Sequence, residues 1–112
     1  AKTYKRGQLV YQIDTQKPFT GIVIGKGRES YHAQRLSYEK SYEDGLQEGY
    51  TKYRYDDGQL ESVIPYKRGK IEGVVIRYYP NGKKRSKIHY TKGLRGGDKG
   101  EIFWSPEGKI IR

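Results

Sequence analysis

Few residues of this chain are of the types that catalyse reactions or bind metal ions, and those few are scattered. The two histidines, His32 and His89, lie far apart in the sequence, and neither has partners at the spacing of a metal site or a catalytic triad. Cysteine is absent, which excludes thiolate ligands and disulfide bonds. We therefore predict no catalytic residue, no bound metal and no cofactor, and interpret the protein as non-enzymatic.

Two short patterns resemble chemical motifs without completing them. Residues 25–27 read Gly-Lys-Gly, as in a phosphate-binding loop, but neither a Gly-Lys-Ser/Thr ending nor a helix pattern follows. Glu48 and Glu72 recur at the same position of two similar segments. A carboxylate at a repeated position favours a structural role, and we expect both to accept hydrogen bonds from turn amides.

Positive charge is the feature that points to a partner. The formal net charge is +10, and residues 67–112 alone hold thirteen Lys and Arg against four acids, whereas residues 41–66 hold two against six. A basic surface suits an acidic protein, acidic lipid headgroups or nucleic acid. The alternative is a set of solvated side chains that keep sheet edges from aggregating. The candidate surface for an anionic partner consists of Lys67, Arg68, Lys70, Lys83, Arg85, Lys87 and His89.

An internal repeat of 24 residues predicts the elements that position these side chains. Residues 42–49 read Tyr-Glu-Asp-Gly-Leu-Gln-Glu-Gly and residues 66–73 read Tyr-Lys-Arg-Gly-Lys-Ile-Glu-Gly. We predict one domain over residues 1–112, with an irregular first unit (1–41) and repeat units 42–65, 66–89 and 90–112. The repeated structural positions are Tyr42, Gly45, Gly49, Tyr55, Gly58, Tyr66, Gly69, Gly73, Tyr79, Gly82, Tyr90 and Gly93.

Each unit predicts a β-hairpin. Gly58 and Gly82 end the connecting turns, and we expect a positive φ at both because glycine adopts it without steric cost. The last turn, residues 105–108, is predicted to be one residue longer. The predicted strands are residues 50–55 and 59–66, 74–79 and 83–90, and 101–104 and 109–112.

The first unit is less regular. Residues 2–6 are interpreted as a basic lead-in, and residues 7–13 as the second strand of a hairpin whose first strand is missing. Residues 22–24 predict a strand, and residues 25–30 a long glycine-rich turn. Residues 30–42 are ambiguous between helix and strand.

Alternation along residues 83–90 predicts two faces. Ser86, Ile88 and Tyr90 share one face, which we interpret as the core, because Ser62, Ile64 and Tyr66 repeat the same pattern. The other face is then a row of outward cations that comprises Lys83, Arg85, Lys87 and His89.

The recurring pattern Tyr-x-x-Gly-x-x-x-Gly, then an aromatic pair, then a turn ending in Gly-Lys or Gly-Gln resembles the MORN repeat, in the variant found in bacterial proteins related to YwqK-type antitoxins. The resemblance covers residues 42–112 closely and residues 7–41 loosely. It implies an all-β fold of tandem β-hairpins in an elongated, twisted antiparallel sheet. It also implies a non-enzymatic module for protein–protein interaction, with an antitoxin-like form in which the partner is a toxin. The alternative is binding of acidic lipid headgroups or nucleic acid through a basic strand face.

Location and assembly are weakly constrained. No apolar run reaches the roughly 18 residues that a membrane-spanning helix needs, so no transmembrane segment is expected. The chain contains no Met, and we expect an initiator methionine, a signal peptide or an upstream region to have been removed. We expect a bacterial cell envelope or exported protein, with the cytoplasm as the alternative, and the sequence leaves the oligomeric state open.

Overall fold

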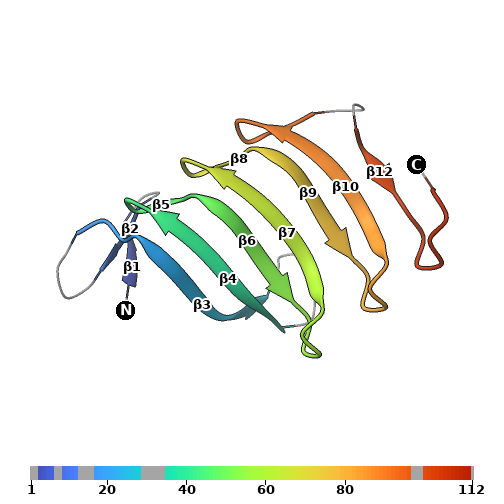
Figure 1. Cartoon of the computed structure of the whole chain (residues 1–112), viewed down its shortest axis with the longest axis horizontal. Helices are drawn as coiled ribbons and strands as arrows, with labels where there is room; N and C mark the ends of the chain where they lie inside the picture. The colour runs from blue at the N-terminus through green and yellow to red at the C-terminus, as the bar shows by residue number, and fades with distance from the viewer. Residues whose placement is uncertain (1–2, 7–8, 13–16, 29–34, 97–99, 112) are drawn as a thin grey trace.

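An open antiparallel sheet makes up most of the molecule (Figure 1). The computed structural model describes residues 3–6, 9–12, 17–28, 35–96 and 100–111. These residues form strands and turns without a helix, and the molecule measures 50 × 31 × 18 Å. The predicted all-β, elongated antiparallel architecture is confirmed. In spatial order the long strands are β3 (Gly21–Arg28), β4 (Arg35–Glu43), β6 (Gly49–Arg54), β7 (Leu60–Lys67), β9 (Gly73–Tyr78) and β10 (Lys84–Thr91).

Short strands extend the long ones at the sheet's edges. Each of three short strands follows a two-residue turn and pairs with the long strand before that turn, and a fourth, β12, pairs with β10. Their bounds are β5 (Leu46–Gln47), β8 (Lys70–Ile71), β11 (Leu94–Arg95) and β12 (Ile102–Phe103).

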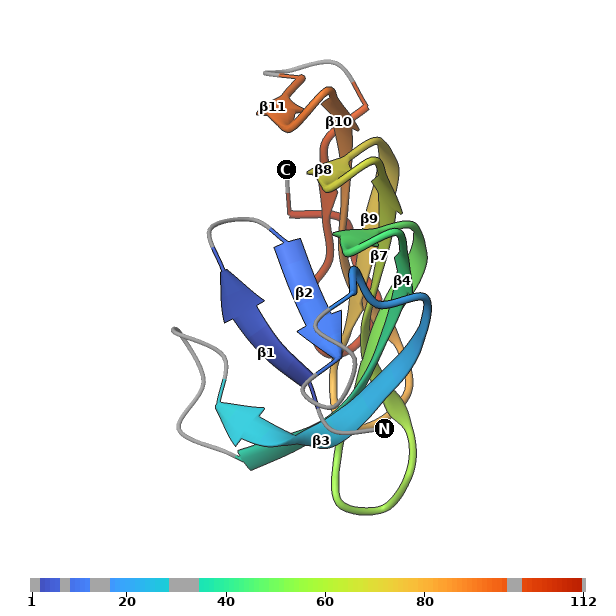
Figure 2. The same cartoon turned by 90° about the vertical axis from the view of Figure 1, so that its left-hand side faces the viewer.

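A separate hairpin of β1 (Thr3–Arg6) and β2 (Leu9–Gln12) lies over one face of the sheet at its N-terminal end (Figure 2). We call this face the inner face and the opposite one the outer face. The interpretation as a lead-in was wrong for residues 3–6, because β1 supplies the first strand that was predicted to be missing. Its four residues are too few for an alternation pattern to be recognised.

The glycine-rich stretch after residue 24 is strand and not the predicted long turn. β3 continues to Arg28 and pairs along its whole length with β4, which settles residues 35–43 as strand. A Cβ on Gly25 would lie 2.5 Å from the Tyr38 hydroxyl oxygen. Glycine is therefore required there because the Tyr38 ring of β4 covers the strand at this point. The rest of the predicted turn, residues 29 and 30, lies outside the described residues.

Tight turns of one kind recur along one edge of the sheet. Arg68 and Gly69 have φ of 49° and 85°, and Lys92 and Gly93 have 49° and 84°. Two consecutive positive values are the signature of the type I′ turn, whose twist matches that of a hairpin. Successive turns are joined, because the Gly69 N–H donates to the Gln47 carbonyl oxygen at 2.8 Å and the Gly93 N–H to that of Ile71 at 2.8 Å.

The repeated glutamates complete these turns. Glu48 Oε1 accepts a hydrogen bond from the Arg68 N–H, and Glu72 Oε1 accepts one from the Lys92 N–H, both at 2.8 Å. The structural role predicted for the two carboxylates is confirmed. Each glutamate ties one unit to the turn of the next.

The opposite edge carries a second series of turns. Gly58 and Gly82 have φ of 88° and 87°, which confirms the prediction of positive values. The N–H of Gly58 donates to the Tyr55 carbonyl oxygen at 2.9 Å, and the N–H of Gly108 donates in the same way to Ser105. The last turn therefore has the same length as the others, and the predicted extra residue is not there. The added length of the last unit lies before Ser105.

The core consists of small, aliphatic and aromatic side chains, Phe19 and Tyr55 among them. Ser62, Ile64, Ser86 and Ile88 are all buried, as the alternation predicted, whereas Tyr66 and Tyr90 of the same predicted face are only half-buried. Leu36 of β4 is also fully buried. One layer of sheet thus has a packed inner face and an outer face that remains accessible.

Candidate functional site

A buried ionic cluster interrupts the predicted cation row. The carboxylate of Glu61 is fully buried, and Arg85 Nη2 lies 3.4 Å from Glu61 Oε2. Arg77 Nη1 lies 3.9 Å from Glu61 Oε1, and the Ser62 hydroxyl donates to the same oxygen at 2.7 Å. Arg85 therefore serves the interior, and its expected place among the outward cations was wrong.

A β-bulge explains the change of direction. The pairing of β10 with β9 shifts between Lys84 and Ser86, so that Arg85 is the extra residue. The pairing of β7 with β6 shifts in the same way at Glu61, 24 residues earlier. A bulge places two residues opposite one and breaks the alternation of side chains. Equivalent residues of neighbouring units, one acidic and one basic, thereby meet.

Burial also fixes the protonation of a tyrosine beside this cluster. Burial, and then the charge of Glu61, raises the pKa of Tyr55 above its usual value near 10. The neutral hydroxyl donates a hydrogen bond to the Tyr78 carbonyl oxygen at 2.6 Å. Tyr79 makes the equivalent bond to Trp104 at 2.6 Å, so this link recurs in the next unit.

The outer face carries one row of facing residues that crosses seven strands. Each member pairs directly with the next in the register of the sheet, and neighbouring strands lie about 4.8 Å apart, so the row is about 29 Å long. We call it the outer row. It consists of Ile24, Glu39, Lys52, Val63, Ile76, Lys87 and Ile102.

A tyrosine and a histidine side chain flank the outer row. Tyr50 pairs with Pro65, and His89 pairs with Val74, on the same face. Tyr50 is 59% exposed and Ile24 is 75% exposed. The outer face thus combines apolar contact area with cations, and its cations Lys52 and Lys87 stand next to aliphatic neighbours.

Hollows lie at the N-terminal end of this face. One of about 210 Å³ is lined by Ile22, Glu39, Ser41, Tyr50 and Lys52. A larger one of about 430 Å³ adjoins it at Glu39 and Lys52 and reaches Arg54, whose Nε lies 3.2 Å from Glu39 Oε1. Glu39 is therefore partly neutralised, and the net charge around these hollows is positive.

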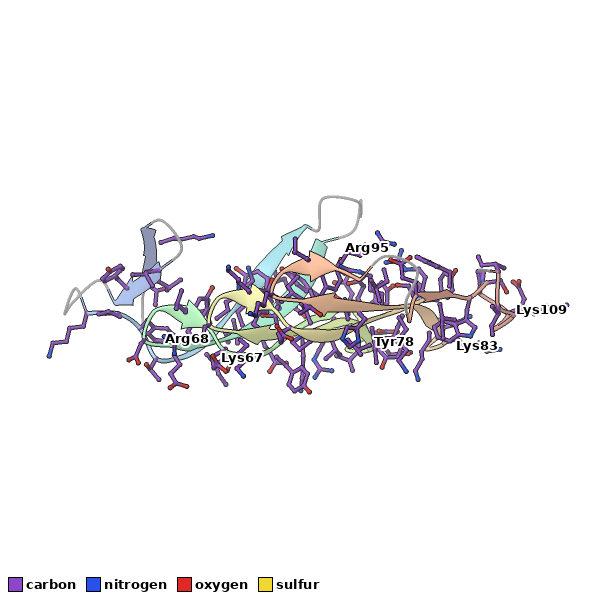
Figure 3. All side chains as sticks on the ribbon, turned by 90° about the horizontal axis from the view of Figure 1, so that it is seen from above. Lys67, Arg68, Tyr78, Lys83, Arg95 and Lys109 are labelled. Carbon is purple, nitrogen blue, oxygen red and sulfur yellow. The ribbon has the colours of Figure 1, made fainter. Side chains whose placement is uncertain are left out.

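The structure divides the seven residues predicted for an anionic partner. Lys67, Arg68 and Lys70 meet at the turn edge, where Lys67 pairs directly with Lys70. Together with Glu72 and Lys92 they line a hollow of about 450 Å³. Lys83 lies towards the far end of the molecule from Lys67 (Figure 3), and its Nζ donates to the Glu107 carbonyl oxygen at 3.1 Å.

The residues predicted from the sequence omit Lys92 at the turn edge and Lys52 and Ile24 on the outer row. Lys92 occupies the repeat position of Arg68, so the 24-residue period could have found it. Lys52 and Ile24 could not be found in this way, because their meeting with Lys87 on one row depends on the register of seven strands. Lys87 and His89 do lie on the outer face, opposite Ile76 and Val74.

Neither a metal-binding cluster nor a membrane-spanning helix is found in the described part of the chain. Among the described residues, no cluster of three His, Asp or Glu side chains could hold a metal ion. The described part of the chain also lacks any helix with the length and apolar character to cross a membrane.

Comparison with known families places the repeat. Residues 47–68 and 71–92 each match the model of the MORN repeat variant. No curated protein and no solved structure matches the chain. The first MORN-variant segment covers β5, β6 and β7, and the second covers β8, β9 and β10. MORN repeats commonly serve as binding modules and are generally non-catalytic.

Proposed function

We propose that this chain is a non-enzymatic protein-interaction module whose outer face binds an acidic, partly apolar segment of a partner protein. The observation that carries the proposal is the outer row, in which aliphatic side chains and cations are mixed over about 29 Å. The hairpin of β1 and β2 lies over the N-terminal end of the inner face, on the side of the sheet away from the outer row (Figure 2).

The two kinds of side chain have different tasks. Tyr50 and Ile76 supply apolar and aromatic area, the class of contact that carries most binding energy at interfaces. Lys52 and Lys87 select a partner of opposite charge and speed its approach. The mixture favours a protein segment over a bare polyanion, which would gain nothing from the apolar side chains.

The test is a comparison of faces. The purified chain would be immobilised and exposed to source-cell extract at low and high salt, alongside an outer-face variant (Tyr50→Glu with Ile76→Glu) and a control (Lys109→Glu) on an exposed turn. We expect an acidic protein to be retained by the wild type and the control and lost by the outer-face variant.

Mapping then identifies the surface. The retained protein, or its acidic segment as a peptide, would be titrated into isotope-labelled chain, and amide shifts should concentrate on β6, β9 and β10. Shifts confined to the turn edge around Arg68 would contradict an outer-face site. A folded outer-face variant that still binds normally would do the same.

An antitoxin-like role is the more specific form of the proposal. The resemblance suggests a protein toxin as the partner, and its acidic surface would cover the outer face. If the retained protein arrests growth when expressed, co-expression of the wild type should restore growth, whereas the outer-face variant should not.

One observation favours a second candidate function, the binding of polyanions. Lys67, Arg68, Lys70 and Lys92 line one hollow, and directly opposed like charges such as Lys67 and Lys70 cost stability unless something compensates them. Vesicles with and without an anionic lipid, and single-stranded DNA, would be the probes. Arg68→Glu with Lys92→Glu should abolish such binding. For nucleic acid, the logarithm of the wild-type association constant should fall linearly with the logarithm of the salt concentration.

A further inference from the structure

The terminal strand β3 is an open edge of unusual composition. It ends the order of strands in the sheet, and in the described part of the chain it pairs with β4 alone. Its side chains Ile22 and Ile24 are 61% and 75% exposed. Natural sheets normally blunt such edges with charges, prolines or short strands, since an unpaired edge accepts another strand. Residues 21–25 of β3 carry none of these.

The direction of the backbone groups of β3 follows from its neighbour. The Glu48 N–H donates to the Ser41 carbonyl oxygen at 2.9 Å, so Ser41 directs its backbone groups away from β3. Alternate residues of a strand point to opposite sides, so Lys40 points towards β3 and meets Val23. Ile22 and Ile24 therefore direct their N–H and C=O groups to the open edge.

The sequence of this edge is the same in both directions. Residues 21–25 read Gly-Ile-Val-Ile-Gly. In an antiparallel pair of two such strands with Val23 at the centre, Ile22 faces Ile24 of the second copy, and Gly21 faces its Gly25. Both isoleucines have their backbone groups directed at the edge, so each Ile22–Ile24 pair can exchange its two hydrogen bonds.

We propose that β3 is a self-pairing edge, through which two copies of this chain join their sheets about a two-fold axis at Val23. The interface is isologous, as in most soluble dimers. The proposal shares Ile24 with the outer row, but it needs neither Tyr50 nor Ile76, the two residues on which the test of the proposed function rests.

Side chains fit this register on both faces. On the outer face the exposed isoleucines pack in pairs across the axis, which removes them from water. On the inner face Gly21 and Gly25 add no side chain to the interface. The Phe19 ring covers Gly21, and the Tyr38 ring covers Gly25. Lys26 comes opposite Thr20 of the second copy and not opposite another cation.

Charge sets the conditions under which the pair forms. Each copy carries a formal net charge of +10, so two copies repel one another over distances that salt screens, with a Debye length of about 10 Å at 0.1 M. Dimerisation should therefore strengthen as salt rises. An acidic partner on the outer face should show the opposite dependence, which separates the two kinds of association.

The test measures molar mass by sedimentation velocity at low and high salt. The wild type should form dimers, and Ile24→Pro should be monomeric yet folded, since proline at this position removes only an N–H that points to the edge. Leu94→Lys is the control, because Leu94 is 73% exposed in β11, at the other end of the sheet. It should dimerise like the wild type.

Paired charge variants test the register and do not depend on proline. Ile22→Lys with Ile24→Lys places like charges in both facing pairs and should raise the dimer dissociation constant by about 100-fold or more. Ile22→Lys with Ile24→Glu places opposite charges there, and its dissociation constant should stay within about 10-fold of the wild-type value. A wild type that stays monomeric at high salt would overturn the proposal, and so would equal dimerisation of the two charge variants. In the first case the open edge would be left for a strand of another protein.

Discussion

The carboxylate of Glu61 offers the sharpest test of how neighbouring units recognise each other. Glu61→Gln keeps the shape of the side chain and removes its charge. Arg85 at 3.4 Å, Arg77 at 3.9 Å and the Ser62 hydroxyl at 2.7 Å would then face a neutral amide in a site without exposure. A hydrogen bond to a charged group contributes about 1.5–3 kcal/mol, and breaking a buried ion pair costs about 3–5 kcal/mol. Since the amide retains one acceptor, we expect a loss of about 2–4 kcal/mol in the free energy of unfolding.

Urea denaturation followed by circular dichroism measures this loss. The midpoint should fall at an unchanged slope, and the melting temperature should fall by roughly 8–32 °C, because about 1 kcal/mol shifts a domain of nearly this size by 4–8 °C. Glu107→Gln is the control, since Glu107 lies exposed in a turn and surface changes usually stay within about 0.5 kcal/mol. A loss below about 1 kcal/mol for Glu61→Gln would refute the reasoning that the cluster stabilises the contact between units.

Three further results are expected. Gly58→Val should destabilise the fold by more than about 1 kcal/mol in thermal melts, because φ at Gly58 is 88° and a valine backbone is strained there. No atom lies near enough to obstruct the new side chain, so backbone strain alone acts. An unchanged melting temperature would contradict the assignment of this turn. Because the pKa of Tyr55 is raised in the folded state, its contribution to stability is complete below the unfolded-state pKa of about 10 and is lost as pH rises through the folded-state pKa. Tyr55→Phe should therefore flatten the decline of stability above pH 10. An equally steep decline would exclude Tyr55 as a cause. Arg85→Glu should unfold the protein or lower its stability by at least about 3 kcal/mol, whereas Lys87→Glu should melt like the wild type, and equal effects of the two would contradict the bulge.

Much of the fold could be predicted because the same local sequence patterns occur in more than one repeat unit. The turn glycines, the two glutamates and the alternation of Ser62 and Ile64 all follow from short-range chemistry that the 24-residue period exposes. Such signals are local, and a second copy of a pattern separates it from chance.

The parts that could not be predicted depend on tertiary contacts or on register. Arg85 left its row because a bulge adds a residue, and strict alternation assumes that none is added. The opposite charges of Glu61 and Arg85 at equivalent positions were the available signal. Gly25 looked like a turn because the ring of Tyr38 that requires glycine in the strand comes from a neighbouring strand.

The regular joining of turns has a consequence for how the molecule can vary in length. In the described part of the chain the hydrogen bonds that join the turns run between neighbouring units. Insertion of one more 24-residue copy would therefore add two strands and lengthen the outer face by about 10 Å without changing any existing turn. Among the described residues, the position of Glu61 and Arg85 resists plain copying, because a duplicated basic unit would bring two arginines together in the interior. A longer relative built from these units should therefore alternate the sign of the charge at this position, and the reach of its outer face should grow in steps of one hairpin.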